Sequence, residues 1–141
     1  MIHSQAEKVV AAVPGSVGTS AVTLTIDTLG YDHASVSVLR ASNASTAFAS
    51  VLKVEQSDDN SSYSDVSGLV GGTDFAIPAV SDTSSVAVVK LDVDTKAKKR
   101  YLKVTATPAV SVNTVVTARL SRGEVAPATA AEAGCIGWVK G

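Results

Sequence analysis

The chain has 141 residues and a formal net charge of −1, a length that suits one domain with a hydrophobic core of its own. Charged residues make up 18% and aromatic residues 4%, so the sequence predicts an aliphatic core and a neutral surface rich in Ser and Thr. This charge balance gives no reason to expect a nucleic-acid partner. No apolar run approaches the length of a membrane-spanning helix, so we expect a soluble domain without a membrane partner.

The small net charge hides an uneven distribution along the chain. Residues 1–95 carry 11 acidic and 4 basic side chains, whereas residues 96–141 carry 8 basic and 2 acidic ones. Two interpretations are open. Either the folded surface mixes the two halves, or patches of opposite sign orient neighbouring copies of the protein.

Valine occurs 23 times and leucine 8 times, the reverse of the usual order. Branching at Cβ favours strands over helices, so the composition predicts an all-β fold. Residues 1–20 are mostly small and hold either one short strand over 8–13 or an extended arm. Residues 22–27 then alternate apolar and polar side chains, which predicts a strand with one buried face.

A turn is expected at residues 29–32, followed by a second strand that ends near Arg40. Residues 41–49 are small and polar and predict a loop. A hairpin follows, with strands at 51–56 and 63–66 and a loop at 57–62 in which Asn60 can adopt a left-handed conformation. Residues 68–78 predict an irregular connection.

Three more strands are expected at 86–93, 100–107 and 112–121, separated by a turn at 94–99 and by Pro108. Seven or eight strands without a helix-length amphipathic run predict two packed antiparallel sheets. We expect a β-sandwich, jelly-roll-like, over residues 21–125, with an N-terminal arm over 1–20 and a C-terminal tail over 126–141. Jelly-roll and immunoglobulin-like topologies both fit the pattern.

The tail differs in composition from the sandwich. Thr129 and Glu132 match a capping box, and Gly134 could end a single helical turn, although Ala-rich tails are often extended. Ile136 and Trp138 are apolar residues in a segment that has no core of its own. Cys135 is the one cysteine, so no internal disulfide can form, which suits a reducing compartment.

No catalytic or metal-binding motif is complete. His33 lies in an expected turn without a recognisable nucleophile or acid, so we predict a solvated histidine and no enzyme activity. The stretch that starts at Asp58 begins like a calcium loop, but its sixth position is Tyr63 and its twelfth is Leu69. Asp92 and Asp94 alone do not complete a ligand set. We expect no metal and no cofactor.

Lys98, Lys99 and Arg100 belong to the one basic cluster, which also includes Lys96. A solvated turn explains this cluster, and contact with an acidic protein surface is the alternative. Exposed tyrosines and Trp138 could form a sugar platform, but the aromatic side chains are few. The candidate interface residues are Val9, Val13, Lys98, Lys99, Arg100, Ile136 and Trp138.

Four segments together resemble the small proteins that decorate or cement the heads of tailed bacteriophages. They are IDTLGYDHA at 26–34, LKVEQSDDNSSYSDV at 52–66, KRYLKVT at 99–105 and LSRGEVAP at 120–127. The resemblance extends over residues 22–134. Similar hairpins occur in other virion proteins, including tail proteins, and Gln56 and Asn60 vary the pattern here.

The resemblance implies a virion structural protein without an active site, made in the host bacterial cytoplasm and placed on the outer capsid surface. It implies a homo-oligomer, a trimer, that binds the major capsid protein and bridges its subunits with extended termini. The alternative function is a sandwich module of a phage tail or fibre that recognises a host surface glycan.

Overall fold

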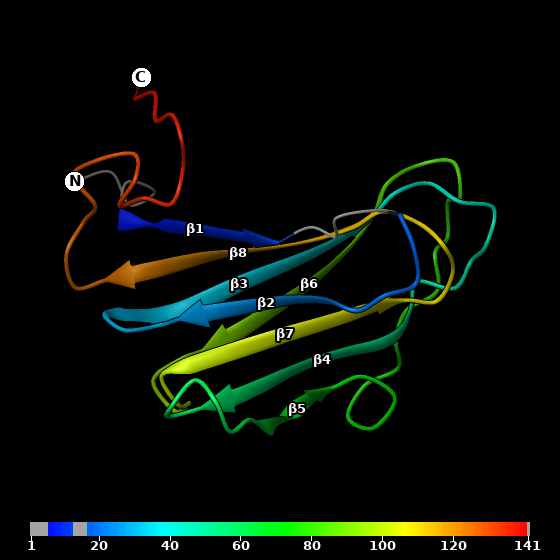
Figure 1. The fold of residues 1–141 in the computed structure, drawn as a ribbon, viewed down its shortest axis with the longest axis horizontal. Coiled ribbons are helices and arrows are strands. Elements are labelled where there is room, and N and C mark those ends of the chain that lie inside the picture. Colours follow the sequence, from blue (N-terminus) through cyan, green and yellow to red (C-terminus); the bar gives the residue numbers. More distant parts are fainter. Residues whose placement is uncertain (1–5, 13–16, 141) are drawn as a thin grey trace.

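The computed structural model describes residues 6–12 and 17–140. It contains eight strands in two four-stranded antiparallel sheets that pack face to face (Figure 1). The strands are β1 (Lys8–Ala12), β2 (Val22–Asp27), β3 (Tyr31–Arg40), β4 (Ala49–Ser57), β5 (Ser64–Val70), β6 (Ala87–Asp94), β7 (Tyr101–Pro108) and β8 (Thr114–Gly123).

The strand order identifies the topology. One sheet, called the β1 sheet here, has the order β1-β8-β3-β6, and the other, the β2 sheet, has the order β2-β7-β4-β5. Eight strands in these two orders form a jelly roll. An immunoglobulin domain instead joins its first, second, fourth and fifth strands in one sheet. The fold is therefore the expected all-β sandwich, and the strand order selects the jelly roll from the two topologies that the sequence left open.

Period-two alternation builds the core between the sheets. In β7, Leu102, Val104 and Ala106 are fully buried, and the residues between them are half-buried on the outer face. β2 and β8 alternate in the same way, as the sequence predicts. Apart from Phe48, the buried core consists of Val, Leu, Ile and Ala side chains, which confirms the aliphatic core expected from the composition.

Two inward-facing positions that lie opposite each other, Arg40 in β3 and Thr114 in β8, are not apolar. Arg40 ends the inward row of β3 and is completely buried. Its Nη2 donates a hydrogen bond to the Ser45 carbonyl oxygen at 2.9 Å, which ties the loop after β3 to the end of the sandwich. Its Nε and Nη1, like the buried hydroxyl of Thr114, have no hydrogen-bond partner among the described residues. Strand alternation alone gave no reason to expect a buried arginine.

Two expected boundaries are wrong. β3 begins at Tyr31, inside the expected turn, because Gly30 adopts a φ of +82° and the Tyr31 amide donates to the Thr28 carbonyl oxygen, so the turn is tight. β5 continues to Val70, beyond the expected irregular start at Gly68. Gly68 has a φ of +88°, and the β4–β5 register shifts between Lys53 and Glu55, so this strand is bulged.

The N-terminal segment belongs partly to the sandwich. Residues 8–12, within the stretch expected to be an arm, form β1 and pair with β8 from Lys8 opposite Leu120 to Ala12 opposite Val116. Of the two alternatives for this stretch, the structure shows the short strand. Val13 lies outside the described residues.

Candidate interaction surface

The segment after β8 forms one capped turn. The Glu132 amide donates to the Thr129 hydroxyl at 3.2 Å, and the Glu132 carboxylate accepts from the amides of Ala128 and Thr129 at 2.7 and 3.4 Å. The Gly134 amide donates to Ala131 O and the Cys135 amide to Ala130 O, with Gly134 at a φ of +77°. These bonds are a capping box and a Schellman stop, so the predicted single turn is confirmed.

This turn packs against the outer edge of β1. The Val9 amide donates to the Ala133 carbonyl oxygen at 2.9 Å, and Ala133 is buried. A Cβ on Gly134 would lie 1.9 Å from the Val9 carbonyl oxygen, so only glycine allows this approach. The contact covers an edge strand that would otherwise present unpaired backbone groups.

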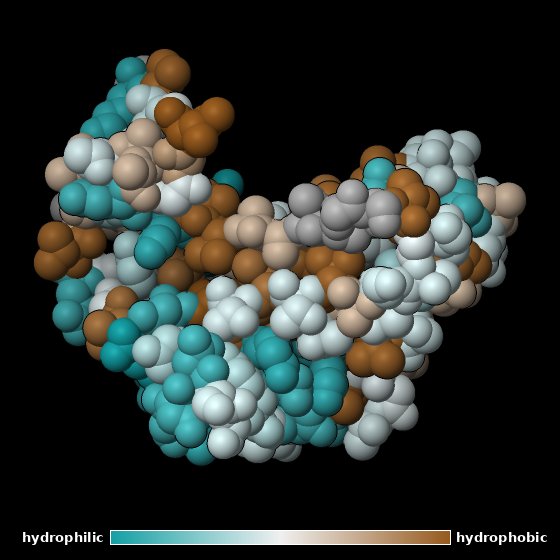
Figure 2. All heavy atoms as spheres, viewed as in Figure 1, coloured by the Kyte–Doolittle hydropathy of each residue, from teal (hydrophilic) through white to brown (hydrophobic). Residues whose placement is uncertain are grey.

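Beyond the turn, the chain leaves the sandwich with its apolar side chains exposed. Ile136 and Val139 are fully exposed, and Trp138 is half-buried with the Lys140 ammonium 3.9 Å above its ring. In Figure 2, apolar residues stand at the free end of this projecting segment. We call Val9, Ile136, Trp138 and Val139 the tail surface.

Two predicted interface residues from opposite ends of the chain meet here. Val9 and Trp138 line the same hollow of about 240 Å³, together with Glu7, Arg119, Ala133 and Cys135. Arg119 Nε is 3.3 Å from the carboxylate of Glu7, so the polar rim of this hollow is ion-paired. Ile136 follows Cys135 directly and extends the same apolar region into solvent.

The predicted basic residues lie elsewhere, in the turn between β6 and β7. Arg100 binds Asp27 through two hydrogen bonds of 2.9 and 2.8 Å, which lower the pKa of the Asp27 carboxyl and raise the pKa of the Arg100 guanidinium. Lys99 Nζ is 2.8 Å from Asp58 Oδ2. The Lys98 amide donates to Thr95 O within the turn. Lys96 also pairs with Asp32, so acids of the same chain neutralise three members of this cluster.

The same pattern accounts for the uneven charge along the sequence. Five ion pairs join a basic residue from 96–141 to an acid from 1–95: Lys96–Asp32, Lys99–Asp58, Arg100–Asp27, Lys103–Glu55 and Arg119–Glu7. The folded surface thus mixes the two halves, as the first of the two interpretations expects.

His33 has neighbours that the sequence did not indicate. It lies in β3, and its Nδ1 is 3.3 Å from Ser121 Oγ of β8, while its Nε2 is 3.9 Å from Asp92 Oδ1 of β6. Lys90 Nζ binds the same carboxylate at 2.8 Å and lowers the pKa of Asp92. A separation of 3.9 Å is too long for a hydrogen bond, so the three residues do not form the bonded chain of a Ser-His-Asp triad.

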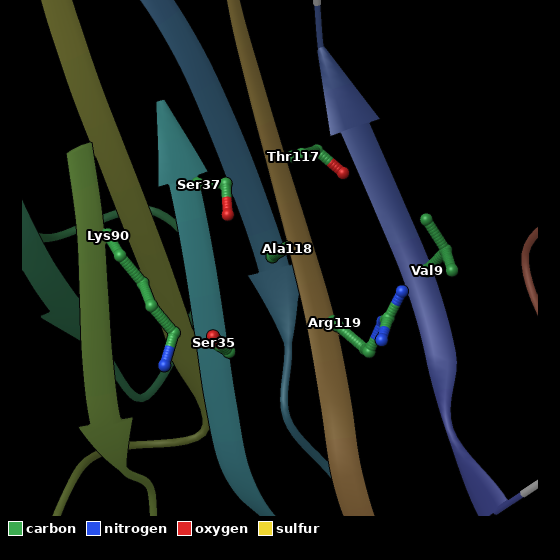
Figure 3. Close-up of a pocket in the computed structure, with 7 residues that line it drawn as sticks. All are labelled: Val9, Ser35, Ser37, Lys90, Thr117, Ala118 and Arg119. Carbon is green, nitrogen blue, oxygen red and sulfur yellow. The ribbon is translucent and has the colours of Figure 1, made fainter. Parts of the chain in front are cut away.

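A second hollow, of about 310 Å³, lies on the outer face of the β1 sheet (Figure 3). Hydroxyls of Ser35 and Ser37 face it, with Lys90 on one flank and Arg119 on the other. Thr117, whose hydroxyl donates to the Val10 carbonyl oxygen at 3.2 Å, completes the lining with Val9 and Ala118. No aromatic ring lines this hollow. Its serine hydroxyls offer donors to a polar ligand, but Lys90 and Arg119 already pair with Asp92 and Glu7, and there is no platform on which a sugar ring could stack.

Residues 6–12 and 17–140 contain neither a cluster of metal-ligating side chains nor a helix long and apolar enough to span a membrane. This part of the chain has no group of three or more His, Cys, Asp or Glu side chains placed to hold a metal ion. In the stretch that begins like a calcium loop, the Asp59 carboxylate instead accepts hydrogen bonds from the amides of Ser61 and Ser62. Within the same residues, no helix has the length and apolar character of a membrane span.

Comparisons with known proteins add little. No family model matches the chain, and no curated protein matches it either. Among solved structures, the chain is similar to CBM32-1, from a family 31 glycoside hydrolase of Clostridium perfringens. The TM-score is 0.41 and the identity 15%, over 76% of this chain and 72% of that one. A likeness of this size does not bear on function, and the jelly-roll assignment rests on the strand order.

Proposed function

We propose that this protein is a capsid decoration protein of a tailed bacteriophage. In this role it binds the outer face of the head and bridges neighbouring major capsid protein subunits. The role is structural and involves no catalysis. The resemblance in residues 22–134 supports the proposal, and the strongest structural support is the way in which the C-terminal segment is held. A self-contained jelly roll holds a capped turn firmly on β1 and then displays Ile136 and Val139 to solvent.

The exposed side chains of Ile136 and Val139 lack the stabilisation that burial provides. Fully burying an aliphatic side chain is worth about 1.5–3 kcal/mol, and the projecting segment gains none of this within its own chain. Tryptophan is enriched among the residues that contribute most of the binding energy at the centre of protein–protein interfaces, and Trp138 lies beside these side chains. The tail surface can therefore supply binding energy once a partner covers it.

A direct test is sedimentation with empty shells assembled from the major capsid protein of the same phage. The triple variant Ile136→Ser, Trp138→Ser and Val139→Ser should fail to sediment with shells that carry the natural protein. Val125→Ser is the control, because Val125 is also an exposed apolar residue but lies outside the tail surface. Equal binding by the triple variant would show that the tail surface is not the docking site.

The alternative function is recognition of a host surface glycan by a phage tail or fibre. The hydroxyl-lined hollow of Figure 3 is the observation that favours it. A glycan array on which binding is lost in Ser35→Ala and Thr117→Val variants would support this alternative. Tight binding to shells without any signal on the glycan array would support the decoration role instead.

A further inference from the structure

β6 is an edge strand: residues 78–82 flank its start, but no described segment bonds to the backbone groups on its outer side. It is the last strand of the β1 sheet and pairs with β3 from Ala87 to Asp94 without a register shift. The other three edge strands differ from β6. The C-terminal turn covers β1, β2 lies against β1 and β8 of the other sheet, and β5 is interrupted by a bulge. A hollow of about 350 Å³ lies between β5 and β6, so these two edges do not cover each other. Natural sheets usually protect long regular edges, because such edges pair with other chains.

The register identifies the backbone groups at the open edge. The Thr95 amide donates to the Asp32 carbonyl oxygen at 3.1 Å, in line with the β3–β6 pairing. Antiparallel ladders alternate, so the odd-numbered residues of β6 direct their amides and carbonyls toward β3. The amides and carbonyls of the even-numbered residues therefore face outward, at Val88, Lys90, Asp92 and Asp94.

The side chains along this edge combine apolar surface with alternating charge. Val86 and Val88 are 59% and 57% exposed, although both are large aliphatic residues. Lys90 and Asp92 follow on the same face, with Nζ and Oδ2 2.8 Å apart. A strand that carries a lysine two residues before an aspartate is complementary to an antiparallel copy of itself.

We propose that β6 pairs with β6 of a second copy about a twofold axis through Leu91, which joins two β1 sheets into one eight-stranded sheet. In this register each Lys90 lies opposite Asp92 of the other copy, and each Val88 lies opposite Asp94. The outward backbone groups of the two strands then meet. A register centred on Lys90 would place two lysines opposite each other, and one centred on Val93 would place Asp92 opposite Asp94. A register centred on Asp92 would place two aspartates opposite each other, and one centred on Val89 would leave Lys90 and Asp92 opposite valines. The register centred on Leu91 is thus the one that pairs Lys90 with Asp92 and opposes no like charges.

This self-association goes beyond the decoration role and does not depend on it. A strand pair about a twofold axis uses the same surface on both copies and closes at two. The resemblance implies a trimer instead, so the mass of the protein in solution distinguishes the two assemblies.

The test exchanges the two charges. Lys90→Asp places acids opposite acids, Asp92→Lys places lysines opposite lysines, and each change should weaken the dimer by at least roughly tenfold. The double variant Lys90→Asp/Asp92→Lys restores opposite charges and should dimerise again. An equimolar mixture of the two single variants should form heterodimers. Light scattering on size-exclusion fractions gives the masses, and circular dichroism confirms that each variant is folded.

Val88→Pro is a second variant that leaves the charges intact. It removes an amide that faces the open edge and none that bonds to β3, so the domain should stay folded while the dimer is lost. A natural protein that is monomeric at every concentration would overturn the proposal. An oligomer whose mass no β6 variant changes, or single variants that neither the double change nor mixing rescues, would overturn it as well.

Discussion

Gly134 fixes the tail to the sheet at a position where a side chain has no room. Its φ of +77° disfavours other residues, and a Cβ would collide with the Val9 carbonyl oxygen. We expect Gly134→Ala to lower the free energy of unfolding by about 1–3 kcal/mol. We also expect the Val9 amide to exchange with solvent faster, because its bond to Ala133 would be lost. Chemical denaturation and hydrogen exchange measure the two effects.

Gly137 provides the matched control three residues further on. A Cβ there meets nothing within 4 Å, so Gly137→Ala should leave both measurements unchanged. If the two variants behaved alike, the contact between the turn and β1 would not stabilise the fold.

Asp59 makes a second prediction about a single side chain. Hydrogen bonds from the amide of Ser62, the hydroxyl of Ser57 and the amide of Ser61 lower the pKa of the Asp59 carboxyl from 3.8 to about 2. The folded pKa lies below the unfolded one. The contribution to stability is therefore fully present above pH 3.8 and is lost as the pH falls toward about 2. An NMR titration of the Asp59 carboxyl carbon should show a midpoint near 2, and a midpoint near 3.8 would contradict the hydrogen-bonded loop.

At the scale of elements, the strands were the most predictable feature. Alternation located β2, β7 and β8 because each buries one face, and side chains on a strand repeat every two residues. The boundary at Tyr31 was missed because a positive φ at Gly30 shortens the turn. Capping chemistry is similarly local, so Thr129, Glu132 and Gly134 predicted the C-terminal turn from their spacing alone.

The C-terminal turn and the projecting segment should have separable roles. Residues 136–140 are exposed apart from the half-buried Trp138, so deleting residues 136–141 should change stability by less than about 1 kcal/mol. Deleting residues 127–141 also removes the cover of β1 and should lower the unfolding temperature. Both deletions should abolish shell binding. Thermal unfolding and sedimentation separate the two effects, and a 136–141 deletion that still binds shells would contradict the role of the tail surface.

At the scale of the whole molecule, the pairing of strands that are far apart in the chain determines contacts that the sequence does not predict. β1 pairs with β8 although Lys8 and Leu120 lie far apart in the chain, and no local pattern encodes that choice. The sequence singled out Val9 and Trp138 separately, whereas their meeting in one hollow depends on this pairing. The contacts of His33 with Ser121 and Asp92 were missed for the same reason.

The composition is consistent with a subunit that completes its surface in an assembly. Five ion pairs join the two halves of the chain. Among the described residues, the tail surface, which we assign to the capsid, and the β6 edge, which we assign to a second copy, stay uncovered. They involve different residues, so variants can disable either one alone.

Electron cryomicroscopy of empty shells mixed with the purified protein tests the decoration role most directly. If the protein decorates the head, added density should follow the symmetry of the shell on its outer face. A jelly roll should fit this density, with residues 136–140 in contact with the capsid protein. The density should be missing with the Ile136→Ser, Trp138→Ser and Val139→Ser variant and present with Val125→Ser. Shells that stay bare in the presence of the natural protein would contradict the decoration role.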